Sequence, residues 1–177
     1  MNYAEIKMPD IANGPGCRVS LFVSGCTHHC PGCFNQVTWD FNYGSPFTQE
    51  TEDELIEHLK APYIQGLTLL GGEPFEHENQ KCLLPFLKRV KKEVPNKSIW
   101  AFSGYVIEDM LEGKMKEWPE TKEILSMIDV LVDGEFKEEL KDITLEFKGS
   151  SNQRTIDVQE TLKRGEIVLV DVSRFKM

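Results

Sequence analysis

Three cysteines form the pattern in this sequence that is most specific for chemistry. Cys26, Cys30 and Cys33 follow one another with C-x3-C-x2-C spacing. Cysteine thiolates bind zinc ions and iron–sulfur clusters, and a structural zinc site or an electron-transfer cluster takes four protein ligands. A cubane [4Fe–4S] cluster held by only three cysteines leaves one iron open for a substrate. The triplet therefore predicts a reactive cluster with these three cysteines as its ligands.

The cysteines also allow another interpretation. His28 or His29 could supply the fourth ligand of a zinc knuckle. The cysteine count of five is odd, because Cys17 and Cys82 lie outside the triplet. Cys17 starts the apolar run that leads into the loop, so we expect it a strand's length away from the metal. Cys82 lies in a helical stretch and is expected to fill apolar space.

The elements that must position the cysteines alternate between strand and helix. Four apolar runs are predicted to be buried strands: 17–23, 66–70, 97–102 and 129–132. They end at the cysteine loop, Gly71-Gly72-Glu73-Pro74, Ser103-Gly104-Tyr105 and Asp133-Gly134. Strands that alternate with helices form right-handed crossovers and a mainly parallel sheet. Because ligands bind at the carboxyl ends of parallel strands, we expect these four turns to form one site.

Helices are expected at 51–60, 79–93, 106–116 and 119–127. The capping-box pattern Thr51-x-x-Glu54 is predicted to open the first, and Pro85 to start or kink the second. Other strands are expected at 2–8, 154–158 and 166–172, the last two around a short helix. Residues 1–177 are predicted to be a single domain, with a core at about 15–135 and a C-terminal extension at 136–177.

Composition and charge argue against several classes of protein. The 177 residues are 40% hydrophobic and 28% charged, as in an ordinary globular chain. The net charge of −9 argues against a nucleic-acid-binding surface. No apolar run approaches the roughly 18 to 20 residues that cross a bilayer, and the N-terminal residues lack a secretory signal. We therefore expect a cytoplasmic protein that binds neither nucleic acid nor membrane.

Further motifs occur in a consistent order along the chain. They are Asn13-Gly14-Pro15-Gly16, the Cys-x-His-x-Cys-x-Gly-Cys-x-Asn form of the cysteine loop, Gly71-Gly72-Glu73-Pro74, Val132-Asp133-Gly134 and Gly149-Ser150-Ser151-Asn152-Gln153. With this set the sequence resembles the radical S-adenosylmethionine (SAM) enzymes. Among them it is most similar to the activating proteins of the anaerobic (class III) ribonucleotide reductase. The motifs run to about residue 154 and so cover most of the chain.

The resemblance implies an α/β fold, a shortened and incomplete (β/α) barrel of the radical SAM type, with a mainly parallel sheet and flanking helices. A full eight-fold barrel takes about 250 residues, so a truncated form suits this length. The implied cofactors are one [4Fe–4S] cluster with three cysteine ligands and SAM, which is cleaved reductively to a 5′-deoxyadenosyl radical. The implied activity is that of an activating oxidoreductase that forms a glycyl radical on the large subunit of the anaerobic ribonucleoside-triphosphate reductase. A one-electron donor such as flavodoxin is the other implied partner, and a homodimer is left open.

The resemblance also assigns SAM contacts, which are Gly32, Cys33, Phe34, Gly71, Gly72, Glu73, Ser103 and Asp133. The Gly-Gly-Glu-Pro turn matches the motif whose backbone meets the SAM amino group, and glycine lets a backbone approach a ligand closely. Most of the superfamily has an aromatic residue before the third cysteine. Gly32 stands there in this chain, and Phe34 follows Cys33, as in the activating proteins. Ser103 and Asp133 are expected near the SAM ribose or a monovalent cation, although ordinary turns also explain them.

Two other functions remain open. Activases of the pyruvate formate-lyase type share the C-x3-C-x2-C spacing, but they carry an aromatic residue where this chain has Gly32. The remote alternative is a zinc-stabilised binding module without catalysis. That module would be colourless and would hold about one zinc ion per chain.

Overall fold

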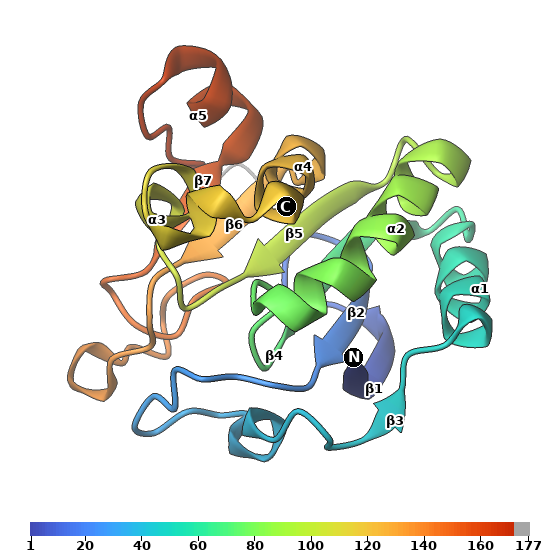
Figure 1. Cartoon of the computed structure of the whole chain (residues 1–177), viewed down its shortest axis with the longest axis horizontal. Coiled ribbons are helices and arrows are strands. Elements are labelled where there is room, and N and C mark those ends of the chain that lie inside the picture. Colours follow the sequence, from blue (N-terminus) through green and yellow to red (C-terminus); the bar gives the residue numbers. More distant parts are fainter. Residues whose placement is uncertain (172–177) are drawn as a thin grey trace.

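A seven-stranded mixed sheet forms the centre of the molecule, with the strand order β3-β1-β2-β4-β5-β6-β7 (Figure 1). This computed structural model describes residues 1–171. The strands are β1 (Asn2–Asp10), β2 (Cys17–Val23), β3 (Ser45–Pro46), β4 (Ile64–Gly71), β5 (Ser98–Phe102), β6 (Val130–Asp133) and β7 (Arg154–Asp157). β2, β4, β5 and β6 are parallel, which confirms the predicted parallel centre. β1 and β3 on one side and β7 on the other are antiparallel.

The helices follow the strands in the predicted alternation. They are α1 (Gln49–Leu59), α2 (His77–Glu93), α3 (Ile107–Leu111), α4 (Pro119–Met127) and α5 (Val158–Arg164), with the short 3-10 helices η1 (Gln36–Trp39), η2 (Lys114–Glu117) and η3 (Glu138–Leu140). None of the helices described between residues 1 and 171 is long and apolar enough to cross a membrane. The mixed α/β class is therefore confirmed, and the incomplete barrel form stays a prediction.

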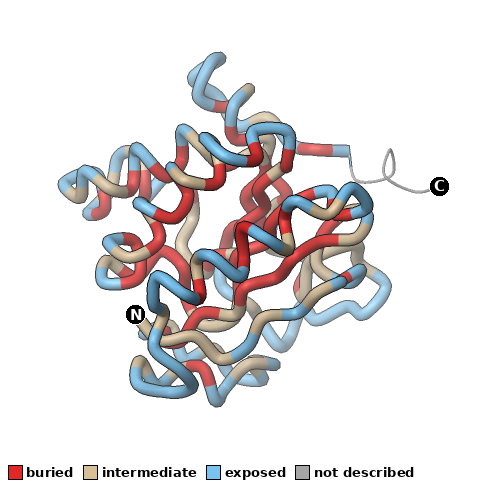
Figure 2. Tube along the Cα trace, turned by 90° about the vertical axis from the view of Figure 1, so that its right-hand side faces the viewer, coloured by how far each residue is buried: buried red, intermediate tan, exposed pale blue. Residues whose placement is uncertain are grey.

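Alternating side chains give the sheet two different faces. One face carries the aliphatic residues Val19, Leu21, Leu67, Leu69, Ile99, Ala101 and Leu131, which form one core with apolar side chains of α1, α2, α3 and α4. These residues are fully buried, and the buried segments in Figure 2 follow the strands and the inner sides of the helices. Burying this apolar surface is the main favourable contribution to folding.

The second face of the sheet is more polar and is covered by loops. Arg18, Ser20, Thr68 and Trp100 occupy the alternate positions there and are all buried. Arg18 donates hydrogen bonds to the Thr68 hydroxyl (2.8 Å) and to the Ser98 carbonyl (3.0 Å). Burial lowers the pKa of Arg18 to about 10. This buried cation ties β2, β4 and β5 together below the carboxyl ends of the strands.

Several predicted boundaries were wrong. The N-cap of α1 is Thr48, and Thr51 is the third helical residue, whose side chain completes a capping box with Thr48. The capping box is therefore formed by the hydroxyls of Thr48 and Thr51, and not by Thr51 and Glu54 as predicted. Pro85 lies inside α2, which begins at His77. Apolar packing of the surrounding helix outweighs the hydrogen bond that Pro85 removes.

The C-terminal part also differs from its prediction. The helix expected at 106–116 is divided into α3 and η2. The strand expected at 154–158 is β7, which pairs antiparallel with β6. The strand expected at 166–172 is reduced to an isolated bridge between Leu169 and Ile156, and position 172 lies outside the described residues.

Candidate functional site

The cysteine loop leaves the carboxyl end of β2 and is fixed at its base by backbone hydrogen bonds. The Gly25 N–H donates to the Thr38 carbonyl (2.7 Å), and the Cys26 N–H donates to the Trp39 carbonyl (3.2 Å). Gly25 has a φ of 104°, and a Cβ there would overlap the ring of Phe41. The loop can therefore leave the strand at this angle only with glycine at position 25. In Figure 1 this loop and the loop after β6 lie at the same end of the molecule.

The Gly71-Gly72-Glu73 turn runs directly beside the base of the cysteine loop. The Gly72 N–H donates to the Val23 carbonyl (2.8 Å), and the Glu73 N–H donates to the Gly25 carbonyl (2.8 Å). A Cβ on Gly72 would lie 2.6 Å from the Gly25 oxygen, which is too close. Two glycines are therefore required here for backbone packing, in addition to any role in approaching a ligand.

A cavity of about 380 Å³ opens between these turns and the 134–153 segment. Its walls include Cys26, Cys30, Cys33, Phe34, Gly71, Gly72, Glu73 and Ser103 from the predicted site. Two of the predicted residues are not in its walls, namely Gly32 and Asp133. The turns after the four parallel strands therefore line one cavity at the same edge of the sheet, which confirms that expectation.

The Asp133 side chain contacts the start of α3 and Arg154 of β7. Its carboxylate is completely buried and accepts hydrogen bonds from the Ile107 N–H (2.9 Å) and from Arg154 (2.6 and 3.0 Å). Asp133 lines a neighbouring cavity of about 680 Å³. Its carboxylate caps the start of α3 and pairs with Arg154 of β7, and the predicted contact with SAM or a cation stays a prediction.

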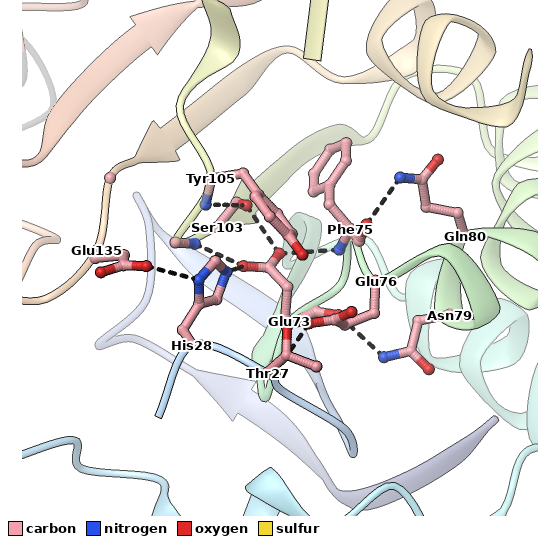
Figure 3. A network of polar contacts seen from close by, with 12 residues as sticks. Thr27, His28, Glu73, Phe75, Glu76, Asn79, Gln80, Ser103, Tyr105 and Glu135 are labelled. Carbon is pink, nitrogen blue, oxygen red and sulfur yellow. Dashed lines mark hydrogen bonds and ion pairs between the residues drawn. The ribbon is translucent and has the colours of Figure 1, made fainter. Parts of the chain in front are cut away.

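Glu73 is the centre of the polar network in Figure 3. Its Oε1 accepts hydrogen bonds from the Gly104 N–H (2.6 Å) and faces His28 Nε2 (2.7 Å). Its Oε2 accepts from the Phe75 N–H (2.9 Å) and the Ser103 hydroxyl (2.8 Å). Only 1% of Glu73 is exposed. The side-chain polar atoms of Glu73 and Ser103 are therefore hydrogen-bonded to each other, to His28 and to the surrounding backbone.

His28 is held on both sides of its ring. Its Nδ1 faces a Glu135 carboxylate oxygen at 3.0 Å, opposite the contact with Glu73 (Figure 3). The ring also packs edge-on against Tyr105, with 4.4 Å between the centroids. Burial by itself lowers the pKa of His28, but the hydrogen bonds and negative charges of the two glutamates raise that pKa above its ordinary value.

A second carboxylate secures the next residue of the loop. The Glu76 Oε1 accepts hydrogen bonds from the Thr27 N–H (2.9 Å) and the Thr27 hydroxyl (2.6 Å). Glu76 precedes α2, so the cysteine loop is attached to the helix that follows the glycine turn. Burial raises the pKa of Tyr105, which lies beside Thr27, to about 12.

The cysteine thiols have different surroundings. Burial raises the pKa of Cys26 to about 12, and burial together with the charge of Glu135 raises the pKa of Cys30. Within residues 1–171, no three histidine, cysteine or carboxylate side chains converge on a single metal-ion position. A cubane cluster contacts each thiolate through a different iron, so its ligands need to share a cavity rather than one point. The three thiols around this cavity are a donor set that suits such a cluster.

Trp39 supplies an additional donor at the cavity. Its Nε1 is buried and has no hydrogen-bond partner among the described residues. The indole lines the cavity and stacks on His29, with 4.4 Å between the ring centroids. Buried donors normally have acceptors, so an acceptor bound near the cavity would satisfy this group.

Sequence reasoning missed most of the cavity wall that the segment after β6 contributes. This wall contains Phe136, Leu145, Phe147, Lys148 and Gln153. The segment 136–148 showed no periodicity, but the Gly149-Ser150-Ser151-Asn152-Gln153 motif gave a signal. Gln153 donates to the Gly134 carbonyl (3.0 Å) and accepts from the Gly149 N–H (2.8 Å). The motif thus folds the segment back onto the end of β6.

Comparison with known proteins identifies relatives of this chain. The model of a family described as a 4Fe-4S single cluster domain matches residues 12–156. The anaerobic ribonucleoside-triphosphate reductase-activating protein of Escherichia coli (strain K12) is 43% identical over 155 residues, which cover 86% of this chain and 96% of that protein. The protein of the same description from Pasteurella multocida (strain Pm70) is 44% identical over 155 residues, which cover 86% and 95%. The one from Enterobacteria phage T4 is 43% identical over 154 residues, which cover 87% and 92%.

The matches extend over nearly the whole length of the relatives, and the family model covers all of the segments that line the cavity. The chain therefore belongs to the family of anaerobic ribonucleoside-triphosphate reductase-activating proteins, and it contains the 4Fe-4S single cluster domain.

Proposed function

We propose that this protein is a radical SAM activase of the anaerobic ribonucleoside-triphosphate reductase. In this proposal Cys26, Cys30 and Cys33 hold a [4Fe–4S] cluster, and SAM binds in the same cavity. One electron from the reduced cluster splits SAM into methionine and a 5′-deoxyadenosyl radical. That radical takes a hydrogen atom from a glycine Cα of the reductase, which leaves 5′-deoxyadenosine and a glycyl radical.

One observation carries the proposal: the three cysteine thiols and the Gly71-Gly72-Glu73 turn line a single cavity at the carboxyl edge of the parallel strands. A structural metal site would need neither an adjoining cavity nor a second turn. The cavity of about 380 Å³ is within the range of small-molecule sites, which are mostly apolar with a few polar groups.

The residues of the chain would bind SAM, orient it and exclude water. Gly71 and Gly72 would bring backbone close to the amino group of the ligand. The aromatic side chains Phe102, Phe136 and Phe147 line the cavity and would cover its apolar parts. Glu73 and Ser103 would act mainly by fixing the backbone around the ligand, because their own polar atoms are already paired.

The proposed partner is the large subunit of the reductase. The relatives are named for activation of this enzyme, and they align over nearly their whole length with the present chain. A one-electron donor such as flavodoxin would reduce the cluster, and the reaction would take place in the cytoplasm. The proposed catalytic unit is the whole chain acting as one radical SAM domain.

The test is radical formation from purified components under anaerobic conditions. The reduced, cluster-loaded protein is mixed with SAM and the reductase large subunit, and 5′-deoxyadenosine and the glycyl-radical EPR doublet are measured. We expect both products, and neither with Cys30→Ala. A reductase that stays without the doublet while a pyruvate formate-lyase gains it would reassign the partner. A colourless protein with zinc and no iron would remove the radical reaction altogether.

A further inference from the structure

The histidine in the cysteine loop is held at both nitrogens of its ring. Only 8% of the His28 side chain is exposed, although it belongs to a loop between two metal-ligand candidates. Its two ring nitrogens lie 2.7 Å from a Glu73 oxygen and 3.0 Å from a Glu135 oxygen. A ring bonded at one nitrogen can still swing about its side-chain bonds, whereas a ring bonded at both nitrogens is fixed in position and plane.

The two glutamates belong to different segments: Glu73 lines the main cavity, and Glu135 lines the neighbouring cavity. Glu73 ends the glycine turn after β4, and its remaining acceptor positions are occupied by Ser103 and backbone N–H groups. Glu135 follows β6, and its carbonyl accepts a hydrogen bond from the Asn152 side chain (2.8 Å). The Glu73 carboxylate is therefore fixed independently of His28, whereas Glu135 is held through its backbone and its side chain is 55% exposed.

The protein also leaves space for this ring. Gly104 has no Cβ, and a Cβ built there would lie 2.6 Å from Cδ2 and 2.7 Å from Nε2 of His28. Tyr105 covers the ring on another side, at 4.4 Å between centroids. His28 and Gly104 line both the main cavity and the neighbouring cavity, so together they form part of the wall between them.

We propose that His28 is a positioning residue, which holds the cysteine loop between Glu73 and Glu135 and so sets the distance between the cysteines and the SAM-binding turn. The proposal rests on the proposed function for the identity of the ligand. It assigns to His28 no contact with the reacting atoms. Its consequence is that SAM affinity and loop rigidity depend on this side chain even when the cysteines and the glycine turn are intact.

The first experiment compares His28→Ala and His28→Gln with wild type and with the control His77→Gln. His77 resembles His28 locally, since it pairs with Glu120 at 3.2 Å and stacks on Trp118, but it lines neither cavity. Hydrogen exchange of residues 26–33 is measured by mass spectrometry in the cluster-loaded and metal-free proteins. The dissociation constant of SAM is taken from the change in the EPR spectrum of the reduced cluster.

We expect the loop in His28→Ala to exchange at least about tenfold faster, because the buried hydrogen bond to the charged Glu73 is lost together with the exposed contact with Glu135. We expect SAM binding to weaken by a similar factor while the iron content is retained. Glutamine can reach one carboxylate with its amide N–H₂ group, so His28→Gln should lie between alanine and wild type. His77→Gln should match wild type in both measurements.

Gly104→Ala provides a second and independent perturbation. It keeps every hydrogen-bonding group and displaces only the His28 ring, so it should reproduce the faster loop exchange. Unchanged loop exchange in both His28→Ala and Gly104→Ala would overturn the proposal. Uniformly faster exchange in the loop and in α4 would also overturn it, since it would show a general loss of stability. Absence of SAM cleavage in wild type would instead refute the proposed function, and the exchange data would still decide whether His28 holds the loop.

Discussion

Replacing Glu73 by glutamine should destabilise the protein far more than the same change at Glu135. Glu73 is 1% exposed and accepts four hydrogen bonds, whereas the Glu135 side chain is 55% exposed and makes one contact with His28. A glutamine at position 73 keeps one acceptor oxygen, and its N–H₂ group must face two of the four donors. The Ser103 hydroxyl can turn to accept, but the Phe75 N–H cannot.

The size of this destabilisation can be worked out from the Phe75 N–H and the His28 ring. An unsatisfied buried N–H costs about 1–3 kcal/mol, and the change from a charged to a neutral acceptor for His28 costs about 1–1.5 kcal/mol. Relief from burying a carboxylate offsets part of this sum, so we expect a loss of about 2–4 kcal/mol for Glu73→Gln. The exposed Glu135→Gln change should cost about 0–1 kcal/mol.

The assay is urea unfolding of the metal-free proteins under reducing conditions, followed by far-UV circular dichroism. The free energies of unfolding are compared at equal m-values, because a change in m would indicate altered denatured or native compactness. A loss below about 1 kcal/mol for Glu73→Gln, or equal losses for the two variants, would refute the view that Glu73 organises this network.

Three further predictions address the cysteines, the histidine and the glycine turn. Cys30→Ala should abolish SAM cleavage and lower the iron content, whereas Cys82→Ala should leave both at the wild-type level. Iron analysis and 5′-deoxyadenosine assays measure these two quantities. Retained activity in Cys30→Ala would contradict the assignment of Cys30 as a cluster ligand. Because the pKa of His28 is raised on folding, its stabilising contribution is complete below its unfolded pKa of about 6.5 and is lost as pH rises through the folded value. The difference in unfolding free energy between wild type and His28→Gln should therefore be larger near pH 6 than near pH 9, and a difference independent of pH would contradict the assignment. Gly72→Ala would place a Cβ 2.6 and 2.8 Å from two backbone carbonyl oxygens. We therefore expect it to lower the free energy of unfolding, measured by thermal unfolding, by about 1–3 kcal/mol. A neutral effect would show that the turn can shift to make room for the Cβ.

The difference between sequence and structure is clearest at Asp133. Its position after an apolar run and before glycine correctly indicated the end of a parallel strand. That position did not indicate that the carboxylate binds Arg154 of the antiparallel strand β7. No local sequence pattern indicates which strand pairs with β6. The contact between Asp133 and Arg154 therefore could not be predicted from the sequence.

Local sequence patterns are sufficient to predict the main strands and the order of the turns. Apolar periodicity located the parallel strands, and glycine and cysteine spacing located the loops at their carboxyl ends, because burial and turn geometry depend on neighbouring residues. The position of His28 between Glu73 and Glu135 becomes visible only in the folded chain, because these residues are 45 and 107 positions away in the sequence. Contacts over such distances depend on strand order, crossover and side-chain packing, which the hydrophobic pattern of one segment does not contain.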